Sequence, residues 1–192
     1  MPSQAFQKWQ TDRADELDEI VAAHVSIGGT GRGRRFATQQ INHAYAMLLS
    51  SQFQGFCRDL HSECIDGLVH VVVPTSMVVI IRNELTLSRK LDKGNPNPGN
   101  IGADFNRLGL PFWNEVIAFN SQNEARKVSI EVLNNWRNAI AHQDFDVQRL
   151  GGISTLHLSH VRSWRRSCDA LALSFDAVME SHLFKTTNIH PW

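Results

Sequence analysis

An arginine and a histidine stand five residues apart in the segment Arg137-Asn138-Ala139-Ile140-Ala141-His142. On a helix, this spacing gives about 140° of rotation and about 7.5 Å of rise, so both side chains border one polar arc that also holds Asn138. A histidine transfers protons near neutral pH, and an arginine binds a phosphate and stabilises charge on its oxygens. This set suits RNA cleavage without a metal ion, with the histidine moving a proton at the ribose 2′-hydroxyl or at the leaving oxygen.

Two interpretations of this segment differ in what the side chains do. In the catalytic interpretation, Arg137 and His142 act with Asn138, and a two-fold dimer supplies a second histidine. The second histidine is needed because one group does not easily act as base and acid on opposite sides of the phosphorus. In the structural interpretation, the segment holds a surface arginine and a histidine near a helix C-terminus, where the helix dipole favours positive charge. Taken alone, the spacing favours the structural interpretation.

Helical periodicity surrounds the segment and runs through most of the chain. The helix that carries it is expected over about residues 121–142, with Leu133, Trp136 and Ile140 facing the core. Apolar residues that recur every three or four positions predict further long helices over 4–26, 36–66 and about 160–184. Shorter elements are expected between them, namely helices over 101–108 and 111–119 and a short strand over 153–158.

Residues 68–81 form the longest apolar run of the chain, and its structure is ambiguous. Its valines and isoleucines favour a strand. However, Pro74-Thr75-Ser76 is a plausible helix start and Gly94 a plausible stop, so the pattern leaves both alternatives open. The run is broken by His70 and Pro74 and is too short to span a bilayer, so no membrane segment is expected.

The composition is that of one globular domain, since 42% of the 192 residues are hydrophobic and 20% are charged. Lysine and arginine number 19, as do aspartate and glutamate, so RNA would be held by local patches and not by overall charge. Charge clusters are usually solvated faces, but two of them are candidate RNA-binding patches. They are Arg32, Arg34 and Arg35 in a glycine-rich loop, and Arg162, Arg165 and Arg166 on the last helix.

The cysteines and histidines indicate neither a disulfide framework nor a metal site. Cys57, Cys64 and Cys168 form no C-x-x-C pair and are expected to be small buried hydrophobes. The histidines are scattered without ligand spacing, so no metal and no cofactor is expected. The N-terminus lacks the basic flank and apolar core of a signal peptide, which predicts a soluble, cytoplasmic protein.

The segment 137–142 resembles the signature of HEPN domains, in which an arginine, four to six residues and a histidine follow one another. A polar residue, often asparagine, commonly follows that arginine, and Asn138 fits. Wider features are similar to the branch called RiboL-PSP-HEPN, and the likeness covers most of the chain beyond about residue 36. They are Leu48-Leu49 through Phe56 to Asp59-Leu60, the turn Lys93-Gly94-Asn95-Pro96, the stretch Leu108-Gly109 to Trp113, and the tail Trp164 to Asp176.

The resemblance implies an all-α, HEPN-like helical bundle with a long C-terminal helix and favours helix over 75–92. One such domain is expected over residues 1–192, although residues 1–35, a first helix and a basic loop, match nothing in the family. It also implies a homodimer whose motif helices face each other across one composite cleft. The implied activity is that of a metal-independent endoribonuclease, with Arg137, His142 and Asn138 as catalytic residues, that leaves 2′,3′-cyclic phosphate and 5′-hydroxyl ends. Members of this kind often act in toxin–antitoxin or phage-defence systems, so an antitoxin or inhibitor protein is a candidate partner beside RNA.

The alternative function is that of a non-catalytic helical module that binds RNA or a partner protein. Such modules occur in the same superfamily but tend to have lost the arginine or the histidine. Arg137 and His142 are both present here, which favours the enzyme. A purely structural bundle is disfavoured by the unbroken polar arc between them.

Overall fold

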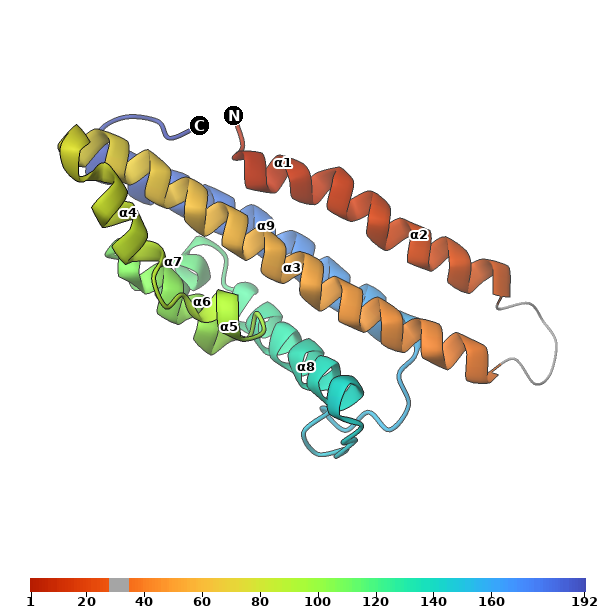
Figure 1. Ribbon diagram of the computed structural model, residues 1–192. Coiled ribbons are helices and arrows are strands. Elements are labelled where there is room, and N and C mark those ends of the chain that lie inside the picture. The colour runs from red at the N-terminus through yellow and green to blue at the C-terminus, as the bar shows by residue number, and fades with distance from the viewer. Residues whose placement is uncertain (28–34) are drawn as a thin grey trace.

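The computed structural model describes residues 1–27 and 35–192, and every regular element within them is helical (Figure 1). Four long rods of these described residues lie side by side. They are α1 (Gln4–Gln10) continued by α2 (Asp12–Ile27), then α3 (Arg35–Val72), α8 (Asn123–His142) and α9 (Leu158–Thr187). The all-α bundle with a long last helix that the sequence predicts is therefore confirmed.

The two longest helices, α3 and α9, run in the same direction and pack along each other. Near their starts, Nη1 of Arg165 donates to the hydroxyl of Tyr45 at 3.4 Å. In their middles, the ring centroids of Phe53 and Phe175 lie 6.0 Å apart. The α1–α2 rod covers one side of this pair and α8 the other, and both run the opposite way (Figure 1). As a result, α8 ends at the end of the bundle where α9 begins.

The chain between α3 and α8 folds into short helical pieces. They are η1 (Thr75–Met77), α4 (Val78–Thr86), α5 (Lys90–Lys93), α6 (Pro98–Phe105), η2 (Asn106–Leu108) and α7 (Phe112–Phe119). The helical alternative for residues 75–92 is therefore correct. The helix is interrupted at Ser88, whose φ of 59° lies in the left-handed region and ends a regular helix.

The prediction of a short strand over residues 153–158 is wrong. No strand occurs in the described residues with which it could pair, and a lone strand leaves its backbone groups unsatisfied. Instead, the carbonyl oxygen of Leu156 accepts a hydrogen bond from Nδ2 of Asn42 at 2.9 Å. The buried side chain of Leu156 then anchors this turn to the start of α3.

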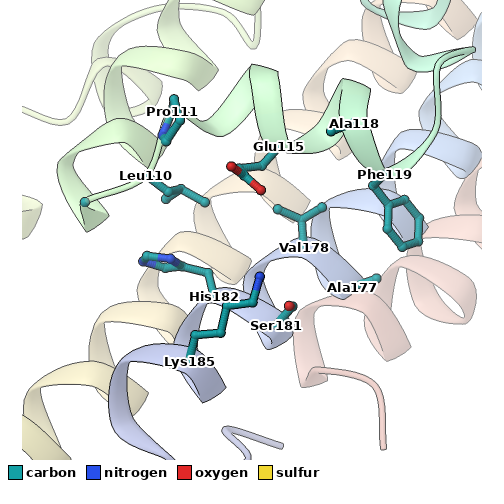
Figure 2. A pocket seen from close by; sticks show the side chains of 11 residues that line it. Leu110, Pro111, Glu115, Ala118, Phe119, Ala177, Val178, Ser181, His182 and Lys185 are labelled. Atoms are coloured by element: carbon teal, nitrogen blue, oxygen red, sulfur yellow. The ribbon is translucent and has the colours of Figure 1, made fainter.

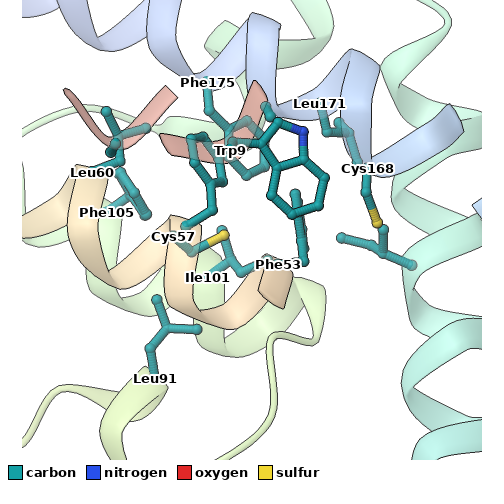
Figure 3. Close-up of a cluster of buried hydrophobic side chains, with 14 of the residues drawn as sticks. Trp9, Phe53, Cys57, Leu60, Leu91, Ile101, Phe105, Cys168, Leu171 and Phe175 are labelled. Atoms are coloured by element: carbon teal, nitrogen blue, oxygen red, sulfur yellow. The ribbon is translucent and has the colours of Figure 1, made fainter. Parts of the chain in front are cut away.

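An aromatic cluster joins the rods at the centre of the bundle (Figure 3). Phe175 of α9 has its ring centroid 4.8 Å from that of Phe112 and 6.0 Å from that of Phe53. Trp9 of α1 meets Phe53 edge-on at 5.7 Å, and Phe105 of α6 stacks on Phe112 at 4.4 Å. Each such buried side chain stabilises the fold by roughly 1.5–3 kcal/mol, so this cluster fixes α1, α6 and α7 against α3 and α9.

The three cysteines are free and buried in the core, as the sequence predicts. Burial raises the pKa of the Cys57, Cys64 and Cys168 thiols well above the ordinary value, which keeps them protonated and unreactive. Among the described helices, none combines the length and the apolar character that crossing a bilayer requires.

Candidate active site at the end of α8

The last turns of α8 present one buried face and one open polar face. Leu133 and Trp136 are buried and Ile140 packs partly against the core, as the sequence predicts. His142 is the last helical residue and is exposed. Gln143 then adopts a left-handed conformation with φ of 56°, which ends the helix there. The histidine therefore stands at the rim of the bundle, open to solvent.

The predicted residues Arg137 and Asn138 are joined by a hydrogen bond. Nη1 of Arg137 donates to Oδ1 of Asn138 at 3.2 Å, and both side chains are half-buried. The same oxygen accepts a second hydrogen bond, at 3.1 Å, from Nδ2 of Asn95. Asn95 in turn accepts from Nδ2 of Asn97 at 2.8 Å. Asn95, in the turn over residues 94–97, thus positions the amide of Asn138, which in turn contacts Arg137.

The turn over residues 94–97, which precedes α6, is itself fixed by α3 and α8. Nε2 of Gln54 on α3 donates to the carbonyl oxygens of Leu91 and Gly94, at 2.6 and 2.8 Å. Nδ2 of the buried Asn134 on α8 donates to the carbonyl oxygen of Pro96 at 3.0 Å. Asn95 is therefore a positioned side chain, although sequence analysis had noted it only as part of a turn.

A hollow of about 250 Å³ lies beside His142 and Asn138. Its far wall is the loop after α8, which folds back onto the helix. Nδ2 of Asn135 donates to the carbonyl oxygen of Arg149 at 3.0 Å, and Nε1 of Trp136 donates to that of Leu150 at 3.3 Å. The polar residues that line the hollow are Asn135, Asn138 and His142 from α8, and Asp144, Asp146 and Arg149 from the loop.

The loop residues Asp144, Asp146 and Arg149 had not been singled out as part of a site. The Asp144-Phe145-Asp146 sequence, one residue beyond the motif, is the signal that points to them. Nε of Arg149 lies 3.5 Å from Oδ2 of Asp146, so one carboxylate is neutralised. No hydrogen bond joins the His142 ring to any described residue, which leaves both ring nitrogens open to a substrate.

The six arginines that formed the candidate RNA-binding patches have different surroundings. Arg162 and Arg166 are exposed on α9. Arg165 pairs with Asp18 and contacts Tyr45, so its guanidinium links α2 to α3 and α9. Arg35 begins α3, but its side chain lies outside the described residues, as do Arg32 and Arg34 entirely. Within the described part of the chain, no three histidine, cysteine or acidic side chains gather closely enough to hold a metal ion.

A second cleft, of about 480 Å³, lies between α7 and the second half of α9 (Figure 2). Leu110, Val178 and Phe119 give it an apolar lining, and the side chains of Glu115 and Lys185 reach toward it from opposite walls (Figure 2). Its histidine, His182, is hydrogen-bonded through Nε2 to the carbonyl oxygen of Leu108 at 2.9 Å. At the end of α8, in contrast, the exposed His142 lines one hollow with Asn138, which is hydrogen-bonded to Arg137, so that region remains the candidate active site.

The chain was compared with known protein families, with curated proteins and with solved structures. None of the three comparisons finds a match.

Proposed function

We propose that this protein is a metal-independent endoribonuclease of the HEPN kind, with Arg137, Asn138 and His142 as its catalytic residues. One observation supports the proposal most. Arg137 and Asn138 are hydrogen-bonded to each other, and Asn138 and the exposed His142 line the same hollow. In this proposal, the phosphate-binding group and the proton-transfer group stand about one turn and a half apart on α8.

In the proposed reaction, the ribose 2′-oxygen attacks the adjacent phosphorus and the bond from phosphorus to the 5′-oxygen breaks. His142 accepts the proton of the 2′-hydroxyl. Arg137 binds the non-bridging oxygens and stabilises the charge that grows on them. Asn138 orients the guanidinium. The leaving 5′-oxygen takes a proton, so the products are a 2′,3′-cyclic phosphate and a 5′-hydroxyl.

The proton for the leaving oxygen comes, in this proposal, from His142 of a second copy of the chain. A two-fold homodimer would set the two α8 ends across one composite cleft. The setting that suits such an activity is a cytoplasmic toxin–antitoxin or phage-defence system, with an antitoxin or inhibitor protein as a further partner.

The decisive experiment measures RNA cleavage and thermal melting on the same preparations of wild type and variants. His142→Ala should lose roughly a hundredfold or more in cleavage rate, because it removes the proton-transfer group. Arg137→Ala should lose a comparable factor, and Asn138→Ala less, because an amide orients groups but carries no proton. His70→Ala, at an exposed histidine near the end of α3, is the matched control and should cleave normally.

Two outcomes would contradict the proposal. Full cleavage by a well-folded His142→Ala protein would remove the catalytic assignment. A wild-type protein that binds RNA but leaves it uncut would support the alternative, a non-catalytic helical module.

A further inference from the structure

Phe145 is a partly exposed aromatic residue in the loop that follows His142. The residue is 42% exposed. The imidazole of His43, on α3, lies beside the ring, with centroids 5.7 Å apart and the planes inclined by 22°. The indole of Trp136 lies at 6.1 Å and 55°. The phenyl ring is thus supported from within the bundle while much of its surface stays open to solvent.

The backbone around Phe145 is held at both ends by α8. The amide of Asp144 donates to the carbonyl oxygen of Ala139 at 3.1 Å. Further along the loop, Asn135 and Trp136 bind the carbonyl oxygens of Arg149 and Leu150. A ring that is already positioned loses little conformational freedom when a ligand stacks on it.

We propose that the solvent-exposed part of the Phe145 ring is a stacking subsite for one unpaired base of single-stranded RNA whose backbone is cut at His142, three residues earlier in the chain. The inference deepens the proposed nuclease function and rests on it. Bases stack on aromatic side chains whatever their identity, whereas bases inside a duplex do not expose a face. The subsite therefore selects single strands, loops and bulges over duplex RNA.

The charges around Phe145 favour a base and disfavour a phosphate. The neighbouring Asp144 is an exposed carboxylate, which repels the RNA backbone, whereas Asp146 is paired with Arg149. Burial lowers the pKa of His43, so at neutral pH an uncharged imidazole supports the ring. The contact with Phe145 is consequently non-ionic, and the phosphate lies toward Arg137.

The test measures the affinity for a short fluorescent single-stranded RNA in full-length protein that carries His142→Ala, so that the RNA is not cut during the measurement. Phe145→Leu removes the aromatic face but keeps apolar bulk, and Phe145→Tyr keeps the ring. Val147→Ala, at another exposed apolar position of the same loop, is the matched control.

Phe145→Leu should weaken the binding of single-stranded RNA roughly tenfold. The factor should be the same at low and high salt, because stacking releases no counterions. Phe145→Leu should cause no loss of affinity for a duplex of the same length, nor for an RNA that lacks the base next to the scissile phosphate. Phe145→Tyr and Val147→Ala should bind within about twofold of the parent.

The proposal of a subsite is contradicted if Phe145→Leu binds single-stranded RNA as tightly as the parent does. It is likewise contradicted if the substitution lowers the affinity for the duplex by the same factor as for the single strand. It is also overturned if the parent binds no RNA. Failure of the nuclease proposal looks different. Wild-type protein would then leave RNA uncut, while the loss caused by Phe145→Leu would persist in the binding assay.

Discussion

At the scale of single residues, the contact of Asn95 with Asn138 offers a test of how the arginine is held. Asn95→Ala removes one of the two hydrogen bonds to Oδ1 of Asn138. Asn138 and Arg137 then lose a positioning contact, so cleavage at saturating RNA should fall about fivefold. Melting and the affinity for RNA should change little. Asn114→Ala, at an exposed asparagine of α7, is the control.

If Asn95→Ala instead lowers the melting temperature and leaves cleavage intact, the residue serves only the turn. Sequence analysis singled out Arg137, Asn138 and His142 because their order and spacing resemble the HEPN signature, whereas the spacing taken alone favoured the structural interpretation. Asn95 could not be found in this way. An asparagine beside glycine and proline is an ordinary turn former, and nothing in the spacing tells which helix its amide meets.

His61 on α3 should make the stability of the fold sensitive to acid. Burial, assisted by the nearby positive charge of Arg89, lowers the pKa of His61 to about 4. Nε2 lies 3.1 Å from the carbonyl oxygen of Asp104, so Nε2 carries the proton and protonation would add a second one on the unpartnered Nδ1. Because the folded pKa lies below the unfolded value of about 6.5, the stabilisation is complete above pH 6.5.

This stabilisation is lost as the pH falls from 6.5 toward 4, by about 3 kcal/mol. Denaturant unfolding at pH 7 and pH 4 should show that loss in the wild type. His61→Gln keeps a donor but does not titrate, so its stability should change less between the two pH values. Equal acid sensitivity in both proteins would rule out His61 as the cause.

At the scale of elements, two helical glycines should respond oppositely to substitution by alanine. A Cβ on Gly102 in α6 would lie 2.9 Å from Cδ1 of Trp113, a ring held by its hydrogen bond to the carbonyl oxygen of Pro98. Gly102→Ala should therefore destabilise the protein by roughly 1–3 kcal/mol. On Gly67 in α3, the nearest atom would be Cβ of Pro191 at 3.6 Å, an ordinary contact.

Gly67→Ala should thus stabilise by up to about 1 kcal/mol, because alanine has the higher helix propensity. Melting temperatures of the two variants give the comparison. Equal shifts in the same direction would show that the packing of α6 on α7 is looser than the structure indicates.

The elements themselves could be predicted to different degrees. The long helices carry their periodicity along many turns, and α8 and α9 lie close to the expected bounds, whereas α3 continues to Val72, beyond the expected end at residue 66. Thr11, with φ of −111° and ψ of −95°, divides the expected first helix into α1 and α2. The break could not be predicted, because no proline or glycine stands at this position. The valines of α4 have strand propensity, but the segment packs against α3 as a helix, so tertiary packing outweighs the local propensity.

At the scale of the whole molecule, the proposed reaction needs no metal ion. Arg137 supplies the charge stabilisation and His142 the proton transfer, so cleavage in excess EDTA should proceed within about twofold of the untreated rate. Activity that disappears with chelator and returns with magnesium would mean that another mechanism operates.

The assembly state decides whether the composite cleft can exist. Light scattering at micromolar concentration should give a mass of twice the 21.7 kDa of one chain. If the ends of α8 face each other, the exposed Ala141 lies at their contact, and Ala141→Glu should yield monomers that no longer cleave RNA. Ile80→Glu places the same charge on α4, where Ile80 is 63% exposed, and should leave the dimer and its activity intact. Dissociation by Ile80→Glu but not by Ala141→Glu would place the interface at α4, and the two histidines would then not share one cleft.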